Sequence, residues 1–175
     1  HAHFLLRSGP KGIAALMRRL LTGYAVSFNL RHRRHGQLFQ NRYKSILCEE
    51  DPYLLELVRY IHLNPLRAKA VADLQELGHY PYSGHSALMG KSVRPWQDIG
   101  YVLGSFGKRV SVARSRYFSY VEEGVSQGRR EDLMGGGLIR SLGGWAEVKG
   151  EREKVRDRIK GDERILGGSD FVSQM

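Results

Sequence analysis

The segment DPYLLELVRYIHLNP, residues 51–65, constrains the fold of this 175-residue chain more than any other segment. Asp51 is a favoured helix N-cap, and Pro52 suits the first helical position, where the missing N–H of proline leaves no hydrogen bond unmade. Pro65 does not continue a helix easily, because it lacks an N–H and its ring clashes with the preceding turn. The segment therefore predicts a helix that begins at Asp51 and ends at Pro65.

Two polar residues of this helix stand beside its apolar stripe. The predicted buried stripe consists of Leu54, Leu57, Val58 and Ile61. Tyr60 and Asn64 are four residues apart and share another face. A tyrosine oxygen can attack phosphorus, and an asparagine oxygen can bind a divalent cation on the same phosphate. The alternative is that Tyr60 is an ordinary helical residue and Asn64 a C-terminal cap.

The first residues, HAHFLLR, alternate as a β-strand does. In a strand, His1 and His3 would point to the same face, so their imidazoles could converge on a metal ion. Two nearby histidines also occur by chance. No methionine precedes His1, and we expect the chain to be truncated at its N-terminus.

The remaining chain predicts further elements. Apolar residues recur at three- and four-residue spacing from Ile13 to Phe28, which indicates a helix running on to about Gly36. QLFQNRYKSIL, residues 37–47, reads as a strand, and KSVRPW, residues 91–96, reads as a linker. Short helical patterns follow the linker. We expect two modules.

The charge of the chain points to an anionic partner. Lys and Arg number 28 against 18 Asp and Glu, a net charge of +10, which favours nucleic acid. No apolar run approaches the roughly 18 residues of a membrane-spanning helix, and no signal peptide is visible. Cys48 is the single cysteine and cannot form an internal disulfide. We expect a cytoplasmic protein without a membrane partner.

Three motifs carry a resemblance. HAHFLL, MRRLLTGYAVSFNLRHRRHGQLFQNRYKS and YLLELVRYIHLNPLRAKAV resemble, in order and spacing, the single-tyrosine HUH transposases, and among these the REP-associated tyrosine transposase branch. The resemblance implies an α+β fold for residues 1–90, the catalytic domain, with an antiparallel sheet and packed helices in ferredoxin-like topology. This fold would be incomplete, because the strand, helix and further strand that open the family fold are missing. Residues 91–175 would form a small helical extension.

The resemblance also implies a site. His1 and His3 match the histidines that hold a divalent metal, Mg²⁺ or Mn²⁺, with Ala2 in place of a bulky apolar residue. Tyr60 matches the nucleophile, and Asn64 matches a further metal ligand. Such a protein cleaves single-stranded DNA beside hairpins, leaves a 5′-phosphotyrosine link and a free 3′-hydroxyl, and rejoins strands by reversal. His62 is expected to pack or to contact DNA.

We expect single-stranded or hairpin DNA to be the partner, in the nucleoid of a bacterial cell. The basic side chains fit a phosphate track, and Tyr24 or Tyr43 could stack on bases. The expected DNA-binding residues are Arg18, Arg19, Arg31, Arg33, Arg34, Gln40, Arg42 and Lys44. Both a monomer and a homodimer are compatible with the sequence.

Two other functions stay open. The chain could be a catalytically inactive remnant of a transposase that still binds DNA hairpins. It could also bind RNA or DNA hairpins without any relation to cleavage. Formation of a covalent protein–DNA adduct distinguishes the enzyme from both.

Overall fold

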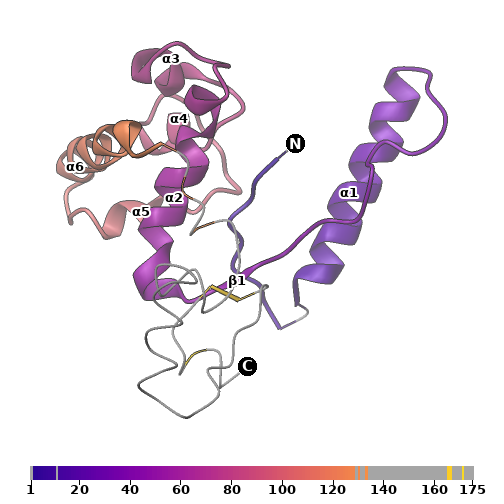
Figure 1. Ribbon diagram of the computed structural model, residues 1–175, viewed down its shortest axis with the longest axis horizontal. Coiled ribbons are helices and arrows are strands. Elements are labelled where there is room, and N and C mark those ends of the chain that lie inside the picture. Colours follow the sequence, from indigo (N-terminus) through magenta and orange to yellow (C-terminus); the bar gives the residue numbers. More distant parts are fainter. Residues whose placement is uncertain are drawn as a thin grey trace, which may run out of the picture. The chain divides into compact units, whose positions relative to one another are not determined.

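A computed structural model describes residues 2–10, 12–128, 130, 133, 165–166 and 171 of the chain (Figure 1). The chain divides into two compact units, residues 1–45 and residues 46–175. The hydrophobic core lies in the second unit, whereas Met17 is the one buried apolar residue among the described residues of the first. The second unit therefore has the packed core that can fix the positions of functional side chains.

The first unit contains helix α1 (Gly12–Arg31), which confirms the predicted helix. The helix ends before Gly36, because the chain turns at Arg33, where φ is 51°. The turn is held by Asn29, whose side-chain Nδ2 donates to the carbonyl of Gly36 over 3.0 Å. Gly36 has a φ of 91°, a conformation that glycine adopts without strain.

The predicted antiparallel sheet is wrong. Residues 2–9 and 37–46 form no strand, and the strand structure of the described residues is a parallel pairing of β1 (Leu47–Cys48) with β2 (Ile165–Leu166). A strand needs a neighbouring strand for its backbone hydrogen bonds, and alternation of side chains does not supply one. The described chain is mostly helical, so neither the α+β class nor the ferredoxin-like topology holds.

In the second unit, helix α2 (Glu50–Arg67) follows β1 and confirms the predicted helix, but both of its ends are shifted. Its N-cap is Glu49 and not Asp51, and Pro65 lies inside the last turn. Pro65 is tolerated because later amides close this end: the N–H of Ala68 donates to the Asn64 carbonyl over 2.8 Å, and that of Ala70 to the Pro65 carbonyl over 2.8 Å.

Four shorter helices gather around α2 (Figure 1). They are α3 (Leu74–His79), α4 (His85–Leu88), α5 (Ile99–Gly104) and α6 (Val110–Glu123), and the 3-10 turn η1 (Val125–Gln127) follows α6. Asp73 and Asp98 cap α3 and α5, because their carboxylates accept from the N–H groups of Glu76 and Tyr101. In the part of the chain that the structure describes, no helix has the length and apolar character to cross a bilayer.

The core differs from the predicted apolar stripe of α2. Val58 of that stripe is buried, but Leu63, which we did not place in the stripe, is fully buried. The core residues packed around them are Val71, Leu77, Leu88, Leu103, Ala113, Tyr117 and Val121. The core thus crosses residue 90, where the sequence led us to divide the chain into two modules. That division stays a prediction.

Residues 91–96, which we expected to form a linker, are tied to α4. The amides of Lys91 and Ser92 donate to the Ser86 carbonyl over 2.8 and 3.3 Å. The hydroxyls of Ser86 and Ser92 lie 2.9 Å apart. Arg94 donates through Nη2 to the Pro81 carbonyl. This segment is therefore an ordered part of the second unit.

Tyr117 joins three helices at the centre of the core. Its hydroxyl lies 2.8 Å from Nδ1 of His62 on α2 and 2.7 Å from Nδ1 of His85 on α4. Burial raises the pKa of Tyr117, so the hydroxyl keeps its proton. Burial also lowers the pKa of His62 to about 3 and of His85 to about 4, so both imidazoles are neutral at pH 7. Packing is thus the role that the structure gives His62.

We predict that acid destabilises the second unit through these two histidines. Between pH 6.5 and 4 the unfolded chain binds protons that the folded chain excludes, so the free energy of unfolding falls as the pH falls. Between pH 7 and 5 the loss should be roughly 2 kcal/mol per histidine. Urea unfolding at both pH values measures it. The exposed His79 is the control: His79→Gln should leave the loss unchanged, and equal stability at both pH values would contradict the prediction.

Candidate functional site

Tyr60 and Asn64 lie one turn apart on α2, and both are partly buried. The Asn64 backbone carbonyl accepts from Ala68, but its side-chain Nδ2 is buried without a hydrogen-bond partner. A buried polar atom without a partner is costly and unusual. Turning the amide over would place Oδ1 in the same position, where an oxygen ligand would be needed.

Arg67 places a cation beside Tyr60. Its guanidinium carbon lies 5.1 Å from the centre of the Tyr60 ring, and Nη1 donates to the Tyr60 carbonyl over 3.3 Å. Nη2 donates to the carbonyl of Gly124 over 3.5 Å, and Nε is buried without a partner. Burial lowers the pKa of Arg67, but a guanidinium stays protonated in proteins. A fixed positive charge of this kind attracts phosphate.

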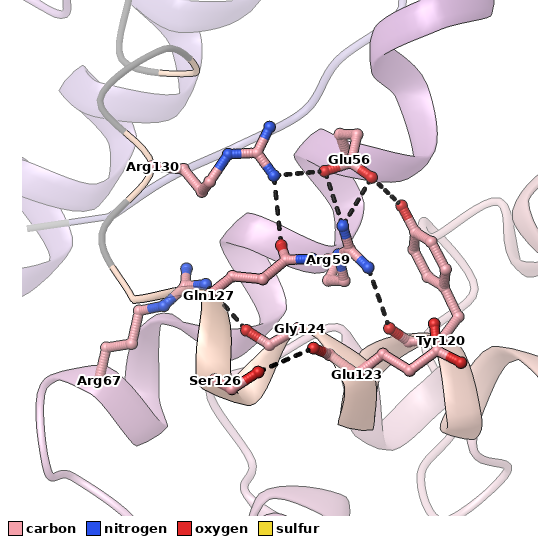
Figure 2. A network of polar contacts seen from close by, with 9 residues as sticks. All are labelled: Glu56, Arg59, Arg67, Tyr120, Glu123, Gly124, Ser126, Gln127 and Arg130. Carbon is pink, nitrogen blue, oxygen red and sulfur yellow. Dashed lines mark hydrogen bonds and ion pairs between the residues drawn. The ribbon is translucent and has the colours of Figure 1, made fainter.

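A polar network anchors the neighbouring face of α2 to α6 (Figure 2). Glu56 accepts from Arg59 Nη2 over 2.6 and 2.8 Å, from the Tyr120 hydroxyl over 2.7 Å, and from Arg130 Nη1 over 2.8 Å. Burial would raise the pKa of Glu56, but the hydrogen bonds from Tyr120 and Arg59 outweigh it, and the pKa is lowered. One carboxylate thus faces two guanidinium groups, so this face remains positive.

Arg59 is 6% exposed, which is rare for an arginine. Its guanidinium carbon lies 4.2 Å from the centre of the Tyr120 ring, and its side chain passes close to Gly124. A Cβ at position 124 would lie 2.5 Å from Arg59 Cδ, so the close approach of the two helices requires glycine there.

The predicted metal ligands are divided between the two units. His1 lies outside the described residues. His3 belongs to the first unit, whereas Asn64 belongs to the second. Burial lowers the pKa of His3, so its imidazole is neutral at pH 7, the form that binds metals. Among the described residues, no three His, Cys, Asp or Glu side chains converge as a metal site. The metal site stays a prediction.

All eight predicted DNA-binding residues are exposed. They lie on α1 and on the segment that follows it: Arg18, Arg19, Arg31, Arg33, Arg34, Gln40, Arg42 and Lys44. Tyr24, a predicted stacking residue, is 55% exposed, and Tyr43 is partly buried. The side chains are accessible to a polyanion, and their role in binding DNA stays a prediction.

Sequence reasoning missed Glu56, Arg59 and Arg67. Glu56 and Arg59 stand three residues apart, a spacing that favours ion pairs on a helix and could have signalled the pair. Arg67 follows Tyr60 by seven residues, about two turns, and so lies on the same face. The partners on α6 leave no local signal, since Tyr120 lies 64 residues after Glu56.

Comparisons of this chain with protein-family models, with curated proteins and with solved structures give no match.

We predict that Glu56→Ala destabilises the second unit by about 3 kcal/mol, because it leaves the buried Arg59 charge without its carboxylate. Urea unfolding monitored by circular dichroism measures the change. Glu123→Ala, on the exposed end of α6, is the matched control and should change stability by less than about 0.5 kcal/mol. Equal effects of the two substitutions would show that the network contributes no stability.

Proposed function

We propose that the protein cleaves and rejoins single-stranded DNA through a covalent bond to Tyr60. The observation that carries the proposal is the position of Arg67, whose cation lies over the Tyr60 ring, with the unpartnered Asn64 amide one turn away. A phenol can attack phosphorus, and a fixed cation beside it can stabilise the charge that develops on the phosphate oxygens. The motif resemblance to single-tyrosine HUH transposases supports the same reaction.

The reaction balances without water. The Tyr60 oxygen forms a bond to phosphorus, and the bond from phosphorus to the 3′-oxygen of the preceding nucleotide breaks. The proton lost by the phenol ends on that 3′-oxygen, so the products are a 5′-phosphotyrosine and a free 3′-hydroxyl. Attack by another 3′-hydroxyl reverses the step and joins new strands. Arg67 would bind a non-bridging phosphate oxygen throughout.

His1, His3 and Asn64 would hold a divalent metal. Two imidazoles and an amide oxygen form a mixed ligand set, which suits Mn²⁺ better than the oxygen-preferring Mg²⁺. When bound, the ion would withdraw charge from the phosphate and stabilise the leaving oxygen.

The exposed basic residues of the first unit would carry the DNA strand. Phosphate contacts of this kind contribute affinity without sequence specificity. Hairpins beside the cleavage site are the expected substrate by resemblance, and the nucleoid is the expected location.

The second candidate function is hairpin binding without cleavage. It is favoured by one observation: the eight predicted DNA-binding residues of the first unit are all exposed and could bind DNA without any nucleophile. Both functions predict binding of hairpin DNA, but only the cleaving enzyme predicts a covalent adduct with it.

We predict that the protein forms a denaturation-resistant adduct with single-stranded hairpin DNA and Mn²⁺, and that Tyr60→Phe abolishes it. The substitution removes one oxygen and keeps the ring, so stability should change by no more than about 1 kcal/mol. Denaturing electrophoresis with labelled DNA detects the adduct. Chelation of the metal should also prevent it.

Tyr53→Phe is the matched control, since Tyr53 is a partly buried tyrosine on the same helix. It should leave the adduct intact. An adduct that persists in Tyr60→Phe would assign the nucleophile to another residue, and no adduct with the unaltered protein would favour hairpin binding alone.

We predict that changing Arg33, Arg34 and Arg42 together to alanine weakens DNA binding at every sequence. Three lost phosphate contacts should reduce the slope of log affinity against log salt by about 2. Fluorescence anisotropy at several salt concentrations measures this slope. The control replaces Lys69, Lys108 and Arg109, which are equally exposed and belong to the second unit. If the control reduces the slope as much, the first unit is not the main track.

A further inference from the structure

Two large aromatic side chains of the second unit are almost fully exposed. Tyr82 is 84% exposed and Trp96 is 74% exposed. Tyr82 lies between α3 and α4, and Trp96 lies between α4 and α5. Aromatic rings of this size contribute most to stability when they are buried, so two exposed rings in one unit indicate a surface that contacts something else.

Arg94 connects the two rings. Its guanidinium carbon lies 5.8 Å from the centre of the Trp96 ring. The same guanidinium donates through Nη2 to the carbonyl of Pro81, the residue before Tyr82. It also donates to the hydroxyl of Ser86 over 3.4 Å. The loops that carry Tyr82 and Trp96 are thus joined at one cation.

The two loops are ordered, so the exposure of the rings is not a consequence of loose chain. The Ser86 and Ser92 hydroxyls bond each other over 2.9 Å, and the Gln97 amide donates to the Gly84 carbonyl over 3.0 Å. The Tyr82 ring also meets the edge of the Tyr80 ring, with centroids 5.6 Å apart. The loops that carry the rings are held in place before any partner arrives, which lowers the entropy cost of binding.

The charge around the rings selects the partner. Residues 77–97 contain no Asp or Glu, whereas they include Lys91, which is exposed, and Arg94. The bordering Glu76 and Asp98 accept from the backbone N–H groups of Ala72 and Tyr101. A protein partner with an apolar surface would need no cations here. A single nucleic-acid strand offers both of the groups that this surface matches, since bases stack on aromatic rings and phosphates pair with Lys and Arg.

We propose that Tyr82, Trp96, Arg94 and Lys91 form a stacking platform that binds unpaired bases of single-stranded DNA. The proposal deepens the proposed function, on which it rests for the choice of DNA, by adding a contact for the same strand on the second unit. Neither the eight predicted DNA-binding residues nor the predicted metal and catalytic residues include any member of this platform.

The test measures stacking directly by tryptophan fluorescence. The chain has two tryptophans, so in a Trp145→Phe background Trp96 is the single reporter. A thymidine oligonucleotide should quench Trp96. An abasic oligonucleotide of equal length and charge should quench weakly and bind about five- to 150-fold less tightly, the equivalent of one stacked base. Equal binding and quenching by the two strands would overturn the proposal, because charge alone would then explain the contact.

Variants locate the contact by anisotropy with the thymidine strand. Trp96→Ala and Tyr82→Ala should each weaken binding about five- to 150-fold, whereas Trp96→Phe, which keeps a ring, should retain most of the affinity. Val93→Ala is the matched control, because Val93 is 91% exposed in the same loop and has no ring. Both rings are exposed, so thermal stability should be unchanged. Unaltered affinity in both alanine variants would overturn the proposal.

All binding measurements are made without metal and in the Tyr60→Phe background. Cleavage is then absent, so the platform and the nucleophile are tested separately. Loss of the adduct in the earlier experiment leaves the quenching expected here unchanged. Conversely, if the protein with Tyr60 forms the adduct but Trp96→Ala and Tyr82→Ala keep full affinity in these binding measurements, the nucleophile is supported and the platform is overturned.

Discussion

The second unit depends on the hydrogen bonds of one buried hydroxyl, that of Tyr117. The hydroxyl has one proton to donate, and it meets Nδ1 of both His62 and His85. One imidazole must therefore accept at Nδ1 while the other donates there, so the two histidines adopt opposite tautomers. Protonation of the accepting imidazole at Nδ1 would break this arrangement, and burial disfavours a charge on either ring, which agrees with the low pKa of both imidazoles. Three helices are joined by groups that stay neutral.

This arrangement also orients α2. Successive residues of a helix are about 100° apart, so a helix that turns His62 and Leu63 toward the core turns Tyr60, Asn64 and Arg67 toward another side. Glu56 and Arg59 face α6. The helix therefore has three tasks, packing against the core, pairing with α6 and presenting polar groups, on sides that overlap, since Glu56 and Leu63 are seven residues apart and lie within about 20° of each other. Each of the first two fixes the rotation that the third requires.

The sequence predicted those parts of the structure whose causes are local. Helices α1 and α2 follow from apolar periodicity, and the sharing of one face by Tyr60 and Asn64 follows from their spacing. The predicted strands HAHFLLR and QLFQNRYKSIL were wrong where the structure describes them, apart from Leu47 in β1, because alternation of side chains does not identify the neighbouring strand that a strand needs. The end of α2 was misplaced because Pro65 removes only one hydrogen bond, the one that its own N–H would donate to the Ile61 carbonyl, whereas the amides of Ala68, Lys69 and Ala70 still bond to carbonyls of the last turn.

Long-range partners explain the rest of what was missed. A buried arginine cannot be recognised from α2 alone, since the Tyr120 ring that covers Arg59 comes 61 residues later. Tyr117 appears in the sequence as one of nine tyrosines, and its two histidine partners are 55 and 32 residues away. The eight predicted DNA-binding residues of the first unit were chosen from residue type and position in the sequence, and their role stays a prediction.

Gly124 fixes the register between α2 and α6. Its missing side chain makes room for Arg59, and its carbonyl accepts from Arg67. One added or deleted residue between Tyr120 and Gly124 would rotate the glycine by about 100° and move it by about 1.5 Å, so both arginines would lose it together. Substitutions elsewhere on α6 can accumulate one at a time, but an insertion or deletion in this turn has no single-step compensation on α2. The register between the two helices is therefore more strictly constrained than the identity of most residues in either.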